Sequence, residues 1–204
     1  MWMLKEQGLA FDHVPTGFLD GGTRTPEHLA LNPNGRVPVL VDDGQPIFES
    51  LAINLYLARK YGGDIAPQSL MDEALAVQWS FWAATEIEKS LLFAAANLQL
   101  FPEAGRNPAH LALALKKLDR PFKVLDAHLA ERAYLLGAAF SVADLNVAAM
   151  MTLIPITGVP IVDYPRMAGW LEQCLERPAA ADWKPLHLTG PCPPTPEGLL
   201  AMFL

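Results

Sequence analysis

A β-hairpin followed at once by a helix is the strongest structural signal in this sequence. Two short apolar runs, Arg36–Val41 and Pro46–Phe48, flank the turn residues Asp42–Gly44. An Asp-Gly pair between two β-type runs predicts a tight hairpin, because both residues tolerate the left-handed backbone that such turns need. Glu49–Tyr61 then has apolar residues at helical spacing, and Gly62 ends the pattern.

The residues before the hairpin predict three further elements. Met1 to Gln7 is typical of the end of a helix, with Gly8 at its C-terminal cap. Ala10 to Val14 predicts a short strand. A short helix is expected to begin at Thr25, because Thr is a good cap and the Pro that follows fits the first turn.

After the hairpin and its helix, the sequence has only helical patterns. Met71–Asn97 contains neither Gly nor Pro, which predicts one long helix. The next helix has a buried stripe with 4-3-4-3-4 spacing, and Pro121 within it predicts a kink. The stripe is formed by Leu111, Leu115, Leu118, Phe122, Leu125 and Leu129. Further helices are expected over Ser141–Leu153 and Pro165–Glu176.

The predicted organisation is therefore a small α/β unit followed by a larger all-helical one. We expect the first domain at residues 1–63, a linker at 64–70, a helical domain at 71–185 and a Pro-rich tail at 186–204. The tail ends in a mostly apolar segment, Gly198–Leu204, for which two readings remain open: disorder, or folding back over a cleft or dimer face.

Charge and composition exclude several functional classes. The formal net charge is -7, and no basic stripe is present, so nucleic acid and anionic membranes are poor partners. Cys174 and Cys192 lie at no metal-ligand spacing and the five His form no metal motif, so no metal site is expected. The longest apolar stretch, Val147–Val162, is interrupted by Pro and Gly, and no signal peptide opens the chain. We expect a cytoplasmic protein.

Two dipeptides near the hairpin suggest a binding site. If the Val37–Pro38 bond is cis, the chain bends, and the backbone N–H and C=O of Val37 can pair with a peptide-like ligand as an added strand would. Glu49 and Ser50 stand at a helix N-terminus, where free N–H groups favour an anion. The Ser50 hydroxyl can donate to a carboxylate and Glu49 can accept from an ammonium group.

Each dipeptide also has an ordinary structural interpretation. Ser50 is a common type of helix cap, and Val-Pro is a frequent dipeptide. Their order along the chain is the stronger signal: turn, Val-Pro strand, hairpin, Glu-Ser helix. Together they predict a site for a peptide backbone with a zwitterionic head group.

These stretches resemble the glutathione S-transferase superfamily of the bacterial cytosolic type. The resemblance rests on NPNGRVPVL, the DG turn and ESLAINLYLARKYG, and on LLGAAFSVADLNVAA and YPRMAGWLEQCLERPA further on. It implies a thioredoxin-like α/β N-terminal domain, apparently truncated, and an all-α C-terminal domain. It also implies glutathione as co-substrate, a hydrophobic electrophile, a role in detoxification, and a homodimer.

The resemblance carries over to individual residues. The residue matching Pro38 is cis in the family, and the one matching Val37 pairs its backbone with the cysteinyl part of glutathione. The residues matching Glu49 and Ser50 hold the γ-glutamyl end, and the one matching Arg36 often lies near the tripeptide.

Two further groups of residues have structural readings. Ser141 and Asp144 have the spacing of a capping box, and the resemblance implies that this motif starts its helix and supports folding. Trp79, Trp82 and Glu86 share one face of the long helix. They form either interdomain core with one solvated or buried acid, or the wall of an electrophile pocket.

The family's thiol-activating Tyr, Ser or Cys follows a first strand that this sequence does not contain. The resemblance therefore implies that the first strand and the start of the first helix, with the catalytic residue, lie before Met1. Either the natural chain is longer, or the truncation is real and the protein is impaired or receives a strand from a partner. The functional alternatives are a transferase that joins glutathione to an electrophile and a non-catalytic glutathione-binding or scaffold protein.

Overall fold

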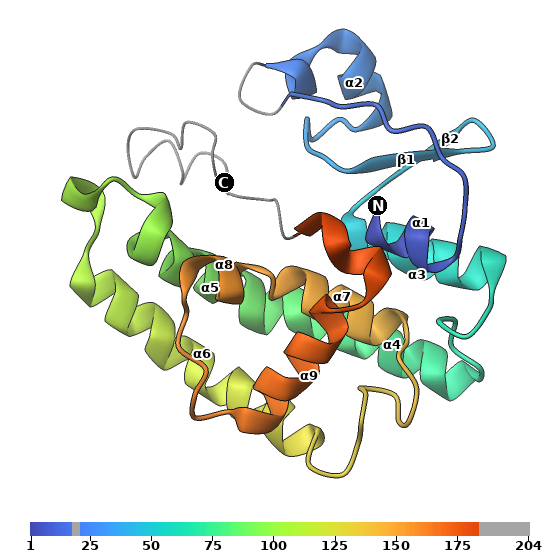
Figure 1. Cartoon of the computed structure of the whole chain (residues 1–204). Helices are drawn as coiled ribbons and strands as arrows, with labels where there is room; N and C mark the ends of the chain where they lie inside the picture. Colours follow the sequence, from blue (N-terminus) through green and yellow to red (C-terminus); the bar gives the residue numbers. More distant parts are fainter. Residues whose placement is uncertain (18–20, 184–204) are drawn as a thin grey trace.

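A computed structural model describes residues 1–17 and 21–183 of the chain (Figure 1). The predicted tail at 186–204, with its apolar end, lies outside the described residues. A small N-terminal unit (residues 1–61) stands above a larger helical unit (residues 70–183), as the sequence predicts.

The N-terminal unit is built around one two-stranded sheet. Its elements are α1 (Trp2–Glu6), η1 (Gly22–Arg24), α2 (Pro26–Leu31), β1 (Val39–Asp42), β2 (Gln45–Phe48) and α3 (Ser50–Tyr61). The antiparallel strands β1 and β2 are joined by Asp43 and Gly44, whose φ angles of 51° and 76° confirm the predicted turn. Pro46 faces Val41 at a position that forms no ladder hydrogen bond, so its missing N–H costs the sheet nothing.

The strand predicted over Ala10–Val14 is wrong. Residues 9–17 have no regular secondary structure, and among the described residues β1 pairs only with β2. A strand exists only through hydrogen bonds to a neighbour. No described strand lies beside this segment to supply them, although its sequence has β-type residues.

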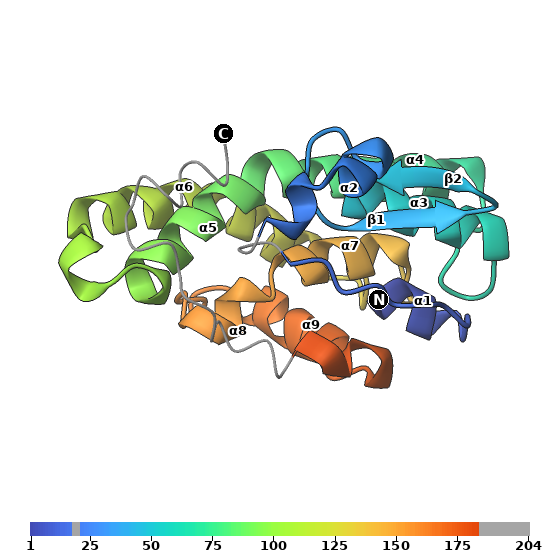
Figure 2. The ribbon, with the colours of Figure 1, turned by 90° about the horizontal axis from the view of Figure 1, so that it is seen from above.

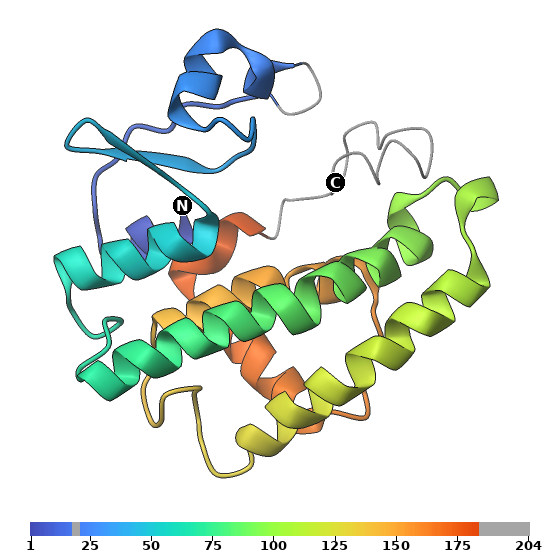
Figure 3. The ribbon, with the colours of Figure 1, turned by 180° about the vertical axis from the view of Figure 1, so that it is seen from behind.

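The helical unit, residues 70–183, contains six α-helices. They are α4 (Leu70–Trp82), α5 (Lys89–Ala95), α6 (Pro108–His128), α7 (Val142–Met150), α8 (Leu153–Thr157) and α9 (Pro165–Leu175), with η5 (Pro178–Trp183) at the end. Two π-helical segments, η2 (Ala83–Glu88) and η3 (Ala96–Leu100), continue α4 and α5, and η4 (Glu103–Gly105) leads into α6. Figure 3 shows α4 to α5 as one unbroken rod, with α6 returning from its far end.

The predicted helices lie at the expected positions in the sequence, but their ends and internal turns differ from the prediction. The helix expected over residues 71–97 is present, but it widens into π turns over 83–88 and 96–100. The helix expected over 141–153 ends at Met150, and α8 starts separately at Leu153. The α6 helix runs without a break through Pro121.

Asp144 confirms the capping box and ties three segments together. Its carboxylate accepts hydrogen bonds from the Ser141 backbone N–H at 3.0 Å and the Ser141 hydroxyl at 2.8 Å. It also accepts from the Leu135 N–H at 2.8 Å and the Trp170 indole at 2.9 Å. Burial raises the pKa of Asp144, and these four bonds oppose that rise.

A buried amide on α7 joins the two units. Asn146 donates to the Ser80 hydroxyl on α4 at 2.8 Å and accepts from the Asn54 amide on α3 at 2.8 Å. Its Nδ2 also lies 3.4 Å from the Leu51 carbonyl oxygen, one residue after Ser50. In Figure 2, which views the molecule from above, α2 and the β1–β2 hairpin lie over the helices of the helical unit. The position of the α3 N-terminus is thus fixed relative to the helical unit.

The contacts of Trp79, Trp82 and Glu86 lie within the helical unit, so they support neither the interdomain core nor the wall of an electrophile pocket. Trp79 is buried and packs against Trp82 at 5.0 Å and His128 at 4.7 Å between ring centroids. Glu86 forms an ion pair with Arg120 on α6. These contacts belong to the packing of α4, η2 and α6.

No helix in residues 1–17 or 21–183 combines the length and apolar character needed to cross a membrane. Within the same residues, no group of three or more His, Cys, Asp or Glu side chains could hold a metal ion.

Candidate functional site

The bond between Val37 and Pro38 is cis, as the resemblance implies. Val37 is 45% exposed, and its backbone N–H and C=O form no hydrogen bond with any part of the chain that the structure describes. Arg36 and Pro38 are also exposed. Val37 therefore presents one free donor and one free acceptor to solvent, which is what an extended peptide needs for pairing.

The N-terminus of α3 is a second open polar surface. Glu49 precedes the helix and Ser50 is its first residue, and both are exposed. The backbone N–H groups of Ser50, Leu51 and Ala52 have no hydrogen-bond partner among the described residues. Together with the Ser50 hydroxyl, they form a cluster of donors at the positive end of a helix dipole, which favours a carboxylate.

Glu49 has an unusual backbone conformation. Its φ is 71°, in a region that side-chain-bearing residues adopt at an energetic cost, whereas Gly would fit without strain. Strain of this kind is common at functional sites. The conformation turns the chain out of β2 and directly into α3.

The strand register brings the two surfaces together. Val39 lies opposite Phe48 in the sheet, so Pro38 and Glu49 extend from the same end of the hairpin. All five predicted binding residues lie at that end; they are Arg36, Val37, Pro38, Glu49 and Ser50. The hairpin thus brings the free backbone groups of Val37 and the donor cluster at the N-terminus of α3 to the same end of the sheet.

A side chain from the helical unit adds charge to this site. Glu88, on η2, is close enough to Glu49 and Arg36 to interact with both. Although the carboxyl group reaches solvent, desolvation raises the pKa of Glu88; the Glu49 charge raises it further and Arg36 opposes the rise. The sequence analysis missed Glu88, because nothing in the long helical pattern distinguishes it from other surface acids.

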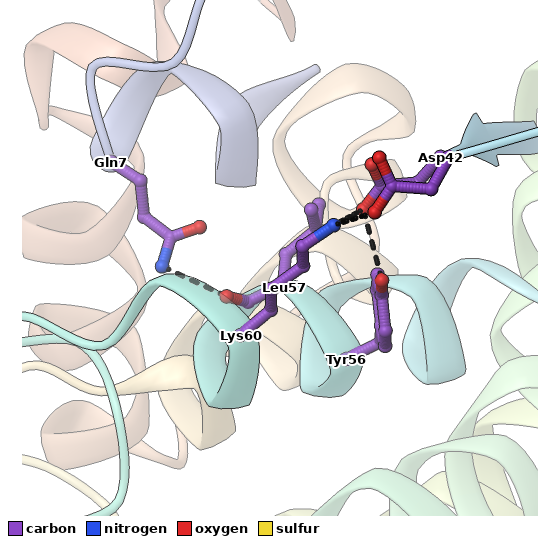
Figure 4. Close-up of polar contacts among 6 residues, drawn as sticks. Gln7, Asp42, Tyr56, Leu57 and Lys60 are labelled. Atoms are coloured by element: carbon purple, nitrogen blue, oxygen red, sulfur yellow. Dashed lines mark hydrogen bonds and ion pairs between the residues drawn. The ribbon is translucent and has the colours of Figure 1, made fainter.

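A polar clasp holds the hairpin on α3 (Figure 4). Tyr56 donates to the Asp42 carboxylate at 2.9 Å, and the Lys60 ammonium group lies 2.7 Å from the same carboxylate and 2.9 Å from that of Asp43. The Lys60 and Tyr56 bonds lower the pKa of Asp42. Across the helix, the Gln7 amide donates to the Leu57 carbonyl at 3.1 Å. These contacts fix α3 between the sheet and α1.

No thiol-activating residue can be assigned in the first described segment. Residues 1–17 contain no Tyr, Ser or Cys, and their one side-chain hydroxyl, on Thr16, contacts the Val14 carbonyl at 3.5 Å. The free thiol of Cys174 is buried in the helical unit, where burial and then the nearby Asp144 charge raise its pKa.

Family models and sequence relatives match most of the chain. The model of the glutathione S-transferase N-terminal domain matches residues 1–59 and that of the C-terminal domain residues 87–178. Glutathione S-transferase 3 of Zea mays is 35% identical over 211 residues, covering 96% of this chain and 90% of the relative. Glutathione S-transferase GstB of Escherichia coli K12 is 31% identical, with 86% of each chain covered.

Solved structures agree with the sequence comparisons. The theta class glutathione S-transferase from Xanthomonas axonopodis pv. citri, solved with glutathione bound, gives a TM-score of 0.84 at 30% identity over 92% of this chain and 91% of that one. Glutathione S-transferase I from mais, in complex with an atrazine glutathione conjugate, gives 0.80 at 28% identity over 93% and 91%. The chain belongs to the glutathione S-transferase family, with a thioredoxin-like N-terminal domain and a helical C-terminal domain.

Proposed function

We propose that this protein binds glutathione at the hairpin end and transfers its thiolate to a hydrophobic electrophile. One observation carries the proposal: the unpaired Val37 edge and the open N-terminus of α3 lie at the same end of one hairpin. Glutathione has a peptide backbone at its centre and an amino-acid head group at its γ-glutamyl end. The two surfaces offer partners for both.

Each residue has a role in this proposal. The N–H and C=O of Val37 pair with the cysteinyl backbone, while cis-Pro38 shapes the edge. The Ser50 hydroxyl and the free N–H groups of α3 bind the γ-glutamyl carboxylate. Glu49 accepts from the γ-glutamyl ammonium group, and that cation also relieves the repulsion between Glu49 and Glu88. Exposed Arg36 faces the anionic tripeptide.

The chemical step joins the glutathione sulfur to carbon. The thiol loses its proton to solvent, the thiolate forms a carbon–sulfur bond, and a leaving group such as halide departs with the bonding electrons. We assign the thiol-activating role to none of the described residues. Relatives solved with glutathione or its conjugates favour a transferase over a non-catalytic binding or scaffold protein.

Calorimetric titration of glutathione into the 204-residue chain tests the binding site. We expect saturable binding that Ser50→Ala and Glu49→Ala both weaken. If neither substitution changes the affinity, the proposed site is wrong. Turnover of an aromatic halide in the presence of glutathione then distinguishes the transferase from the non-catalytic alternative.

We also propose a homodimer that docks through the outer face of α4. This helix exposes a row of apolar side chains at helical spacing, with Leu70 at 83%, Val77 at 40% and Phe81 at 67% exposure and Ala74 between them. A stripe of this kind is typical of an interface, and a second copy supplies an identical apolar partner. Sedimentation should show a dimer that Phe81→Asp converts to monomer; a monomeric wild-type chain would refute the interface.

The proposal includes a division of the chain and a location. We assign residues 1–63 to glutathione binding, 64–70 to a linker and 71–185 to the helical domain. Consecutive positive φ angles at Gly62 and Gly63, after α3, support the first boundary. A cytoplasmic location suits a protein that uses reduced glutathione, and fractionation of the source cells would test it.

A further inference from the structure

Two side chains on and after α2 converge on the carbonyl oxygen of Arg36. His28 Nε2 lies 3.0 Å from this oxygen, and the Asn32 amide donates to it at 2.8 Å. We propose that His28 and Asn32 are positioning residues for glutathione, which act by fixing the peptide group that carries the Val37 N–H. The inference rests on the proposed function and adds two residues that do not touch the ligand.

The geometry of the peptide bond connects this carbonyl to the ligand. The Arg36 carbonyl and the Val37 N–H belong to one planar peptide unit, which is trans, so the N–H points opposite to the oxygen. Two donors on the oxygen therefore set the direction of the Val37 N–H. Without these two donors the Arg36–Val37 peptide group can rotate, and the Val37 N–H is no longer held toward the cysteinyl backbone of glutathione.

Both side chains are held in place by their surroundings. His28 is 8% exposed and Asn32 is 2% exposed. Thr25 caps α2 by accepting from the His28 N–H at 3.3 Å. The Asn32 Oδ1 accepts from the backbone N–H of Asn34 at 3.0 Å and from its side chain at 3.1 Å, which leaves the Asn32 Nδ2 to face Arg36.

The hydrogen-bond chemistry also determines the tautomer of His28. A carbonyl oxygen only accepts, so the proton must be on Nε2 for this bond to exist. The His28 contribution is the donor itself, and a neutral amide at the same position can replace it.

A pair of substitutions at His28 tests the inference by calorimetric titration of glutathione. His28→Leu fills similar space and removes the donor, and we expect the dissociation constant to rise about tenfold, the equivalent of one lost hydrogen bond. His28→Gln places an amide N–H near the former Nε2, and we expect affinity within about threefold of wild type. Unchanged affinity in His28→Leu would overturn the inference.

Amide hydrogen exchange at saturating glutathione distinguishes positioning from general destabilisation. Ligand should slow exchange of the Val37 N–H in wild type and His28→Gln. In His28→Leu, we expect this slowing to be lost at Val37 and kept at Ser50. Equal loss at both positions means a general structural effect and would refute the inference.

A second variant covers the case in which His28→Leu does not fold. Asn32→Asp has the same shape and keeps the oxygen that accepts from Asn34, but it places a carboxylate oxygen against the Arg36 carbonyl where the donor was. We expect the same loss of protection at Val37. Failure of the wild-type chain to bind glutathione would refute the proposed function together with this inference. If the wild-type chain binds glutathione and Ser50→Ala weakens this binding, but neither His28→Leu nor Asn32→Asp changes it, only the inference is refuted.

Discussion

Replacing Asp144 with Asn tests whether this buried carboxylate acts as an acceptor in all four of its hydrogen bonds. Asn keeps Oδ1, which accepts from Leu135 and Trp170. Its amide nitrogen replaces Oδ2, which accepts from the Ser141 N–H and hydroxyl. The Ser141 hydroxyl can turn to accept, but the Ser141 N–H then faces another donor at about 3 Å and loses its partner.

The cost of Asp144→Asn follows from these contacts. A buried N–H left without a partner costs about 1–3 kcal/mol, and the two retained bonds each lose about 1 kcal/mol when the acceptor is no longer charged. Relief of the desolvation of a buried charge offsets part of this loss. We expect a net destabilisation of about 3 kcal/mol, which lowers the melting temperature by roughly 6–12 °C in a protein of this size.

Thermal unfolding followed by circular dichroism measures the effect. Asp163→Asn is the matched control, because Asp163 is exposed, and we expect its melting temperature to stay within about 1 °C of wild type. A change below about 1 kcal/mol in Asp144→Asn would refute the reasoning. It would mean that the Ser141 N–H does not depend on a carboxylate oxygen at this position.

Three other outcomes are expected. Glu49→Gly should raise the stability by about 1 kcal/mol in thermal unfolding, because φ is 71°, while weakening glutathione binding; a destabilised variant would contradict the strain argument. Tyr56→Phe should lower the melting temperature because its hydrogen bond to Asp42 is lost, and an unchanged melting temperature would show that this bond contributes nothing to stability. Desolvation raises the pKa of Glu6, but its hydrogen bonds to Arg177 and Trp2 lower that pKa by more. The Glu6–Arg177 ion pair therefore stabilises the fold at pH values above the unfolded-state pKa near 4.5. This contribution is lost as the pH falls below that pKa. Glu6→Gln should therefore make the stability less dependent on pH below about 4.5, and an identical loss of stability in acid in the two proteins would contradict this assignment.

The elements that the sequence predicts correctly are specified by local chemistry. Asp43 and Gly44 adopt the left-handed turn that their residue types allow, and Thr25 and Ser141 cap the helices that follow them. Each of these signals involves only residues within one turn of the chain, so it can be read without knowing the fold.

The elements that the sequence does not predict depend on distant contacts. A strand over residues 10–14 needs a neighbour to pair with, and alternation of side chains cannot supply one. The π turns at 83–88 and 96–100 and the break after Met150 contain no Gly or Pro to mark them. For the site, the residue types at Val37 and Ser50 suggested the ligand chemistry, whereas Glu88 and the role of His28 depend on tertiary placement.

The contacts of Asn146 have a thermodynamic consequence for the whole chain. This amide lies between α3, which begins at Ser50, and the helical unit. A ligand that binds only the folded state adds about 2.7 kcal/mol of stability at a hundredfold excess over its dissociation constant. Since the buried amide couples the two units, we expect glutathione to move the unfolding of both together in one cooperative transition. Asn146→Leu should lower the melting temperature of this transition without dividing it, because a shared hydrophobic core and the Glu6–Arg177 pair also join the two units.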